Sequence, residues 1–106
     1  MFGTNGGPRI GQDMIGRSVI VRTYSAGVHF GTLARIERTE VLLTDARRIW
    51  QWSGAFTLSA VASKGVGRDS KLSVSVPEIL FTEAIEIIPC TEEATANLRA
   101  LAAHEI

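Results

Sequence analysis

The first segment of this chain with side chains suited to ligand binding is RTYSAGVHFG, residues 22–31. Its polar, small and aromatic residues are Tyr24, Ser25, Gly27 and His29. Small residues at a turn leave backbone N–H groups uncovered, and such groups can hold an anion. The histidine could contact a ligand or could be a buried structural residue, and the pattern leaves both interpretations open.

The second segment is DARRIWQWSG, residues 45–54, which places two arginines beside two tryptophans. On an extended strand Arg48, Trp50 and Trp52 share one face, while Arg47 points to the other. Indole rings can stack a base while a guanidinium group holds a phosphate. At most one of the two arginines should therefore reach a pocket. Alternatively, the tryptophans pack against a helix or a second subunit, and Arg48 pairs with Asp45.

Signatures of catalysis are missing from the sequence. His29 and His104 have no Cys or His partner at a metal-ligand spacing, and no phosphate-loop, dinucleotide or nucleophile-elbow motif is found. Glu83 and Glu86 have opposite parity on one strand and would point to opposite faces. The sequence therefore predicts a binding protein with no catalytic residues, no metal and no cofactor.

Composition narrows the choice of partners. The chain has 106 residues, enough for one domain, of which 45% are hydrophobic and 21% charged. Eleven basic and eleven acidic residues give a formal net charge of zero, which argues against a nucleic-acid polymer or an anionic membrane as the partner. The single cysteine, Cys90, predicts a reducing compartment and a small buried side chain. With no long apolar run and no signal-peptide pattern, we expect a cytoplasmic protein.

The elements that position the two segments follow from periodicity. Residues 1–13 are rich in glycine and predict a flexible N-terminal tail, and residues 14–106 predict one ligand-binding domain. Gly31, inside a strand, indicates a bulge, or a close approach by another backbone or by a ligand. Expected strands are 17–24, 28–37, 39–46 with an extended continuation to 54, 72–76 and 78–88. Expected helices are 57–65 and 92–106, the latter capped by Thr91. Short connections favour hairpins, so we expect an α+β fold with a mostly antiparallel sheet, a short middle helix and a C-terminal helix.

Three stretches carry a resemblance to known proteins. RTYSAGVHFG (22–31), the pattern ARRIW-W-GA-TL (46–58) and PEI--TEAIEIIPC (77–90) occur in this order. They resemble a family of small phage and prophage proteins similar to the Thoeris anti-defence proteins. The resemblance covers residues 14–100 and leaves out the glycine-rich start.

This resemblance implies a function and a setting. The related proteins are non-enzymatic oligomers that act as sponges for cyclic ADP-ribose signals made by bacterial defence enzymes, and some also bind cyclic oligonucleotides. By the resemblance, this chain would be a homo-oligomer that sequesters a cyclic nucleotide in the cytoplasm of an infected or lysogenic bacterium. The alternative is a structural phage factor, or one that binds a host protein.

Overall fold

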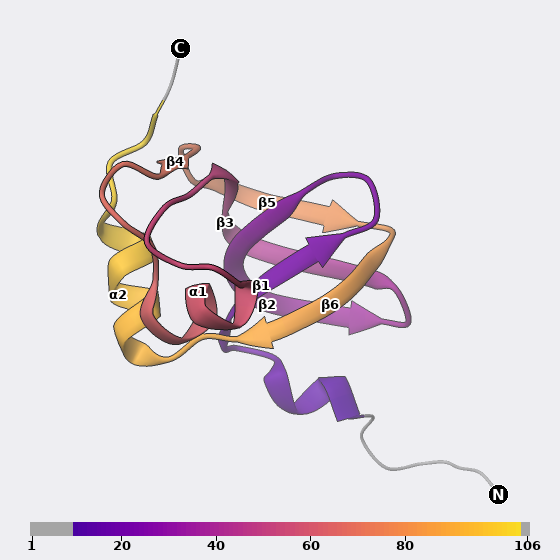
Figure 1. The fold of residues 1–106 in the computed structure, drawn as a ribbon. Coiled ribbons are helices and arrows are strands. Elements are labelled where there is room, and N and C mark those ends of the chain that lie inside the picture. The colour runs from indigo at the N-terminus through magenta and orange to yellow at the C-terminus, as the bar shows by residue number, and fades with distance from the viewer. Residues whose placement is uncertain (1–9, 105–106) are drawn as a thin grey trace, which may run out of the picture.

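The structure is a computed structural model that describes residues 10–104. Figure 1 shows a curled sheet with two α-helices against it. The elements are η1 (Ile10–Met14), β1 (Ser18–Thr23), β2 (Val28–Glu37), β3 (Glu40–Gln51), α1 (Leu58–Lys64), β4 (Lys71–Leu72), β5 (Val76–Phe81), β6 (Ala84–Pro89) and α2 (Glu92–Ala100). The mostly antiparallel sheet, the short middle helix and the C-terminal helix confirm the α+β prediction at this level.

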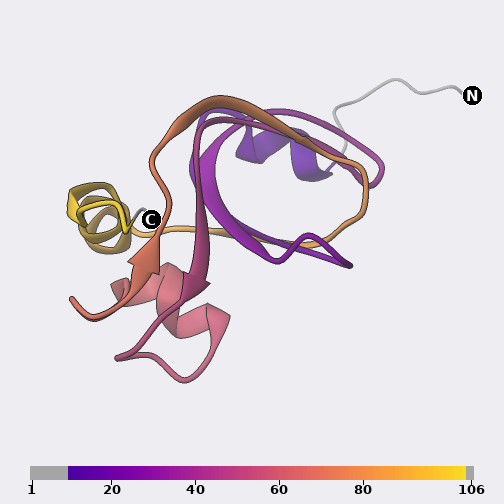
Figure 2. The same ribbon diagram turned by 90° about the horizontal axis from the view of Figure 1, so that it is seen from above.

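The sheet is organised around β3. The strand order is β4-β3-β2-β1-β6, and β5 joins β3 beside β4. β2 pairs along one edge of β3, whereas β5 pairs with its first half and β4 with its end. Figure 2 shows the strands curling round on themselves, with α1 and α2 outside the curl. Among the described residues, β5 pairs only with β3 and β6 only with β1, so each has one open edge.

A bulge bends the central pair of strands. The β2–β3 register shifts between Phe30 and Thr32, and opposite this point Asp45 adopts a positive φ of 50°. A Cβ atom on Gly31 would lie 3.0 Å from the carbonyl oxygen of Thr44. A side chain there would be crowded by this backbone, so both the bulge and the close approach by another backbone are observed.

Two hydrophobic cores lie on opposite faces of the sheet. The inner core fills the curl, and Val19, Val21 and Leu33 are among its fully buried residues. The outer core lies between the sheet and the helices, and it includes Ile20 and Phe30. β1 is therefore buried on both faces. This burial explains its unbroken apolar run, because each face of the strand has its own core to fill.

The helices begin and end where their capping residues indicate. The Thr57 hydroxyl accepts a hydrogen bond from the Ala60 N–H, and Gly65 ends α1 with a φ of 88°, as predicted for 57–65. The Asn97 side chain bonds both the N–H and the carbonyl of Val66, which ties the end of α1 to α2. α2 stops at Ala100, earlier than expected. The chain is extended from Leu101, and the His104 N–H donates to the Leu72 carbonyl.

The C-terminal strands differ from the sequence prediction. The single strand expected at 78–88 is wrong, because the chain turns at 82–83 and divides it into β5 and β6. The Tyr24 N–H donates to the Glu83 carbonyl, and the Thr39 hydroxyl donates to the Thr82 carbonyl, so the corner is fixed by distant residues. The strand expected at 72–76 is also wrong, since only its first and last residues lie in strands, β4 and β5.

The predicted tail is only partly within the structure. Residues 1–9 lie outside the described residues, and residues 10–13 belong to η1. The Gln12 side-chain amide donates to the Ile36 carbonyl at 3.0 Å, so η1 rests on β2. None of the helices within residues 10–104 has the length and apolar character needed to cross a membrane.

Candidate ligand-binding groove

A groove forms where β3 runs past the start of β2. The last β2–β3 pair is Val28 with Ile49, so beyond Ile49 the β2 edge of β3 faces the turn at 25–27, while its other edge pairs with β4. The groove has a volume of about 440 Å³. It is lined by Ser25, Ala26, Gly27, Val28, Arg48, Ile49, Trp50 and Trp52. Both segments singled out in the sequence thus contribute to one surface.

Arg48 offers an uncommitted positive charge to the groove. Ser73 fixes its backbone, because the Arg48 N–H donates to the Ser73 hydroxyl at 2.8 Å and the Ser73 N–H donates to the Arg48 carbonyl. Its side chain is exposed, and the guanidinium has no hydrogen bond or ion pair within residues 10–104. A guanidinium in this state can bind a phosphate or a carboxylate with two hydrogen bonds.

Arg47 has a structural role. It is 4% exposed, and it donates from Nε to the Ser73 carbonyl and from Nη1 to the Leu98 carbonyl at 2.7 Å. Burial lowers the pKa of its guanidinium below the usual value. Its hydrogen bonds tie β3 to the end of α2, away from the groove. The two arginines therefore serve different parts of the molecule.

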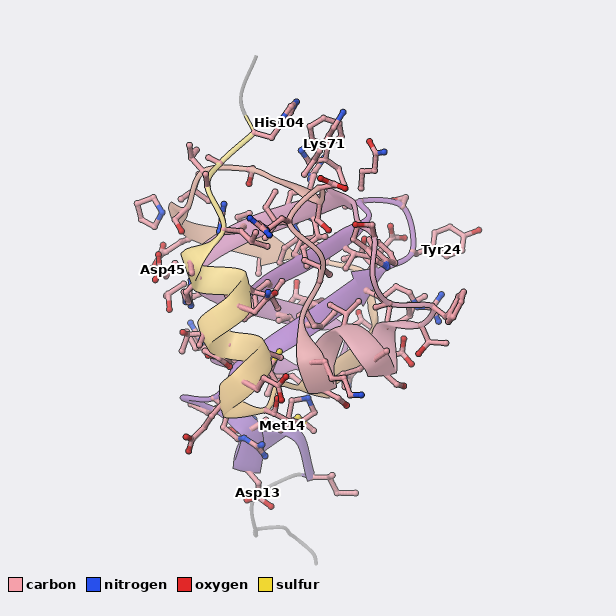
Figure 3. The ribbon with its side chains drawn as sticks, turned by 60° about the vertical axis from the view of Figure 1, so that its left-hand side comes forward. Asp13, Met14, Tyr24, Asp45, Lys71 and His104 are labelled. Carbon is pink, nitrogen blue, oxygen red and sulfur yellow. The ribbon has the colours of Figure 1, made fainter. Side chains whose placement is uncertain are left out.

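Asp45 does not neutralise Arg48. Its carboxylate pairs with Arg99 at 3.1 Å, and the same guanidinium donates to the Asp45 carbonyl and lies over the Phe30 ring. Figure 3 shows Asp45 beside α2. The alternative in which Arg48 pairs with Asp45 is therefore not found in this structure.

The two tryptophans have different surroundings. Trp50 is 45% exposed, with the Lys71 ammonium 5.4 Å from its ring centre and the His104 ring 5.5 Å away. Figure 3 shows Lys71 and His104 next to each other at the same end of the molecule. Trp52 lies beyond the end of β3 and packs against the outer core, so it presents only part of its ring to the groove.

The remaining predicted residues lie beside or beneath the groove. Tyr24 is 77% exposed and does not line it, and Figure 3 shows its side chain pointing away from the body of the protein. His29 is fully buried, with Nε2 2.9 Å from the Ala26 carbonyl oxygen and its ring against Phe81. Because a carbonyl only accepts, Nε2 carries the proton, and Nδ1 has no partner in the described structure.

The cysteine thiol and the possible metal ligands within residues 10–104 form no further site. Burial raises the pKa of the Cys90 thiol to about 11, which makes it a poor nucleophile. No cluster of three or more His, Cys, Asp or Glu side chains within residues 10–104 could hold a metal ion. The sequence did not indicate the contact between Lys71 and Trp50, which forms because β4 pairs with the end of β3.

The two arginines should differ sharply in their effect on stability. Arg47→Ala leaves two carbonyls without donors, and we expect it to lower the free energy of unfolding by about 1–3 kcal/mol. Arg48→Ala should change it by no more than about 0.5 kcal/mol, because the side chain is exposed and unpaired. Urea unfolding measures both. Equal effects would contradict the assignment of Arg47 to structure and Arg48 to the surface.

His29 should make the protein less stable in mild acid. Burial lowers the pKa of its imidazole below the ordinary value of 6.5, so the unfolded chain takes up the proton first. The free energy of unfolding should therefore fall as the pH drops below about 6.5. Above that pH, the titration of His29 should contribute no pH dependence to the free energy of unfolding. His29→Gln should remove this slope in urea unfolding, and His104→Gln, an exposed control, should keep it. A slope that persists without His29 would contradict this origin.

The comparisons with known proteins concern the family and the fold. No curated protein matches the chain in sequence. Among solved structures, the fold is similar to that of a heptameric archaeal Sm protein, whose crystal structure has implications for the eukaryotic snRNP core. The TM-score is 0.51 at 19% identity, over 76% of this chain and 94% of that one. A family model described as a domain of unknown function (DUF6948) matches residues 16–98, which hold all six strands and the groove, and the chain therefore belongs to the DUF6948 family.

Proposed function

We propose that this protein binds and sequesters a cyclic nucleotide signal without catalysing any reaction on it. The observation that carries the proposal is the groove in which Arg48 and two tryptophans face a turn with small residues. Such a ligand consists of a flat base, riboses and phosphates. A guanidinium and backbone N–H groups suit the phosphates, and indole rings suit the base.

The charge around the groove suits an anionic ligand. None of the residues that line it is acidic, and Arg48 and the nearby Lys71 are both basic. The net charge of the whole chain is zero, so the positive charge at the groove is a local excess. A small anion is therefore a better partner than a nucleic-acid polymer, which requires a longer basic surface.

Tight binding by a sponge needs more enclosure than one subunit offers. A nanomolar dissociation constant corresponds to about −12 kcal/mol, and a ligand of about 35 heavy atoms supplies that only when most of its surface is covered. The groove is a shallow surface feature of a small domain. A second copy that closes over it would supply the missing contacts, so we propose a homo-oligomer.

The sheet itself favours assembly. The open edges of β5 and β6 expose backbone N–H and C=O groups, and the exposed side chains Leu80 and Ile85 lie on these strands. The two edges differ, so copies would join head to tail, which generates rings when the rotation closes. The Sm protein of similar fold is heptameric, and this fact supports the same proposal.

The setting of the proposal comes from the resemblance in the sequence. Its motifs lie within residues 22–31, 46–58 and 77–90, and the first two contribute the groove. A sponge of this kind would work in the cytoplasm of an infected or lysogenic bacterium, where it would lower the concentration of a defence signal such as a cyclic ADP-ribose isomer or a cyclic oligonucleotide.

The second candidate is a structural factor or one that binds a host protein. Phe56, in the loop between β3 and α1, is completely exposed, and an exposed aromatic ring is a typical anchor for another protein. This alternative predicts no response to any cyclic nucleotide.

A ligand panel tests the proposed function. We expect one of the cyclic ADP-ribose isomers or cyclic di- and trinucleotides to raise the melting temperature by several degrees, since a ligand at 100 times its dissociation constant adds about 2.7 kcal/mol. Arg48→Ala should weaken that ligand about 10- to 150-fold in calorimetric titration. Arg35→Ala, an exposed arginine at the far end of β2, is the control and should bind normally. A panel without any response would refute the function.

Light scattering tests the assembly. We expect a mass several times the 11.5 kDa of one chain at about micromolar concentration. Ile85→Lys should lower the mass by placing a charge on the open edge of β6. Val74→Lys, which changes an equally exposed apolar residue outside the strands, should not. A monomer mass for the unmodified protein would contradict the homo-oligomer.

A further inference from the structure

The turn between β1 and β2 is held by hydrogen bonds that draw its carbonyl groups inward. The Thr23 hydroxyl donates to the Gly27 carbonyl at 2.9 Å and accepts from the Ala26 N–H at 2.8 Å. His29 Nε2 binds the Ala26 carbonyl at 2.9 Å, and the Thr23 N–H donates to the Gly27 carbonyl. Both anchoring side chains are buried. The orientation of the turn is therefore fixed from beneath.

The same bonds leave two backbone N–H groups of the turn without an acceptor. Within residues 10–104, the backbone N–H groups of Ser25 and Gly27 have no hydrogen-bond acceptor, whereas that of Ala26 between them is taken by Thr23. Ser25, Ala26 and Gly27 are exposed and line the groove. Gly27 has a φ of 87°, a conformation that other residues rarely adopt. N–H groups presented together at such a turn bind anions.

We propose that this turn is the phosphate-binding part of the groove, with Ser25 and Gly27 N–H as donors and Thr23 and His29 as positioning residues. Arg48, on the other wall of the groove, would neutralise the charge of the bound group. The ligand class is a phosphate or a pyrophosphate group, free or within a larger molecule. This inference rests on the proposed groove but not on the identity of the ring that accompanies the phosphate.

One acidic side chain faces the turn and limits its affinity. The Ser25 hydroxyl donates to Glu83 at 3.1 Å, on the side of the turn that lies toward β5 and β6. A carboxylate near an anion site repels the anion. Glu83→Gln keeps an acceptor for Ser25 and removes the charge, so this variant should bind pyrophosphate more tightly than the parent.

Inorganic pyrophosphate is the probe, because it carries the phosphates without a ring. In amide NMR of the full chain, pyrophosphate should shift the Ser25 and Gly27 signals much more than the Ala26 signal, whose N–H is already bonded. Calorimetric titration should give Thr23→Val about 3- to 10-fold weaker binding, the factor expected when a hydrogen bond of ordinary net strength is lost. Thr23→Ser should restore it. Thr39→Val, which removes a hydroxyl that bonds elsewhere, is the control.

The outcomes separate this inference from the proposed function. A shift spread over the surface, or equal shifts at residues 25–27, would overturn the inference even if Thr23→Val failed to fold. A cyclic nucleotide that binds to Thr23→Val with the same affinity as to the parent, and that leaves the amide signals of residues 25–27 unshifted, would refute the phosphate-binding turn but support the proposed function. Specific pyrophosphate binding at the turn, with no response to the nucleotide panel, would support the phosphate-binding turn and refute the proposed function.

Discussion

The long strand β3 is the element on which the rest of the structure depends. It is paired with β2 on one edge and with β5 and β4 on the other, and it contributes Val41 and Leu43 to the inner core and Ile49 to the outer core. Such a strand can curl only if its ladder is interrupted, and the bulge at Asp45 opposite Gly31 provides the interruption. Arg99 then holds the Asp45 carbonyl and carboxylate against α2, so the bend and the helical layer stabilise each other.

The groove is a consequence of the same strand. β3 extends past the start of β2, so on that edge its end has the turn at 25–27 as a neighbour, while β4 pairs with its other edge. Alternation along the strand sends Arg47 to the helix and Arg48 to the surface. Beyond Gln51 the regular alternation stops, which is why Trp52 packs on the outer core while Trp50 stays half exposed. The strand β3 thus determines the positions of both the structural arginine, Arg47, and the exposed arginine, Arg48.

Short sequence patterns predicted the elements whose formation depends on neighbouring residues alone. Thr57 and Gly65 mark α1, Gly27 marks the turn, and Gly31 marks the bulge, because each residue acts on its own few neighbours. The corner at 82–83 was not predictable in this way. Both of its sides are apolar and alternate as one strand would, and the bonds that fix it come from Tyr24 and Thr39. The burial of His29 likewise depends on Phe81, far along the chain, and no spacing in the sequence reveals that contact.

The polar side chains of the groove lie outside both hydrophobic cores, and this separation concerns how the protein can evolve. Ser25, Ala26 and Arg48 are exposed, whereas Thr23 and His29, which hold the turn in place, are buried. Substitutions at exposed positions change stability little, so the surface that meets a ligand can vary while the scaffold stays intact. A lineage of such proteins could therefore follow a changing ligand by altering a few side chains, without having to find a new fold.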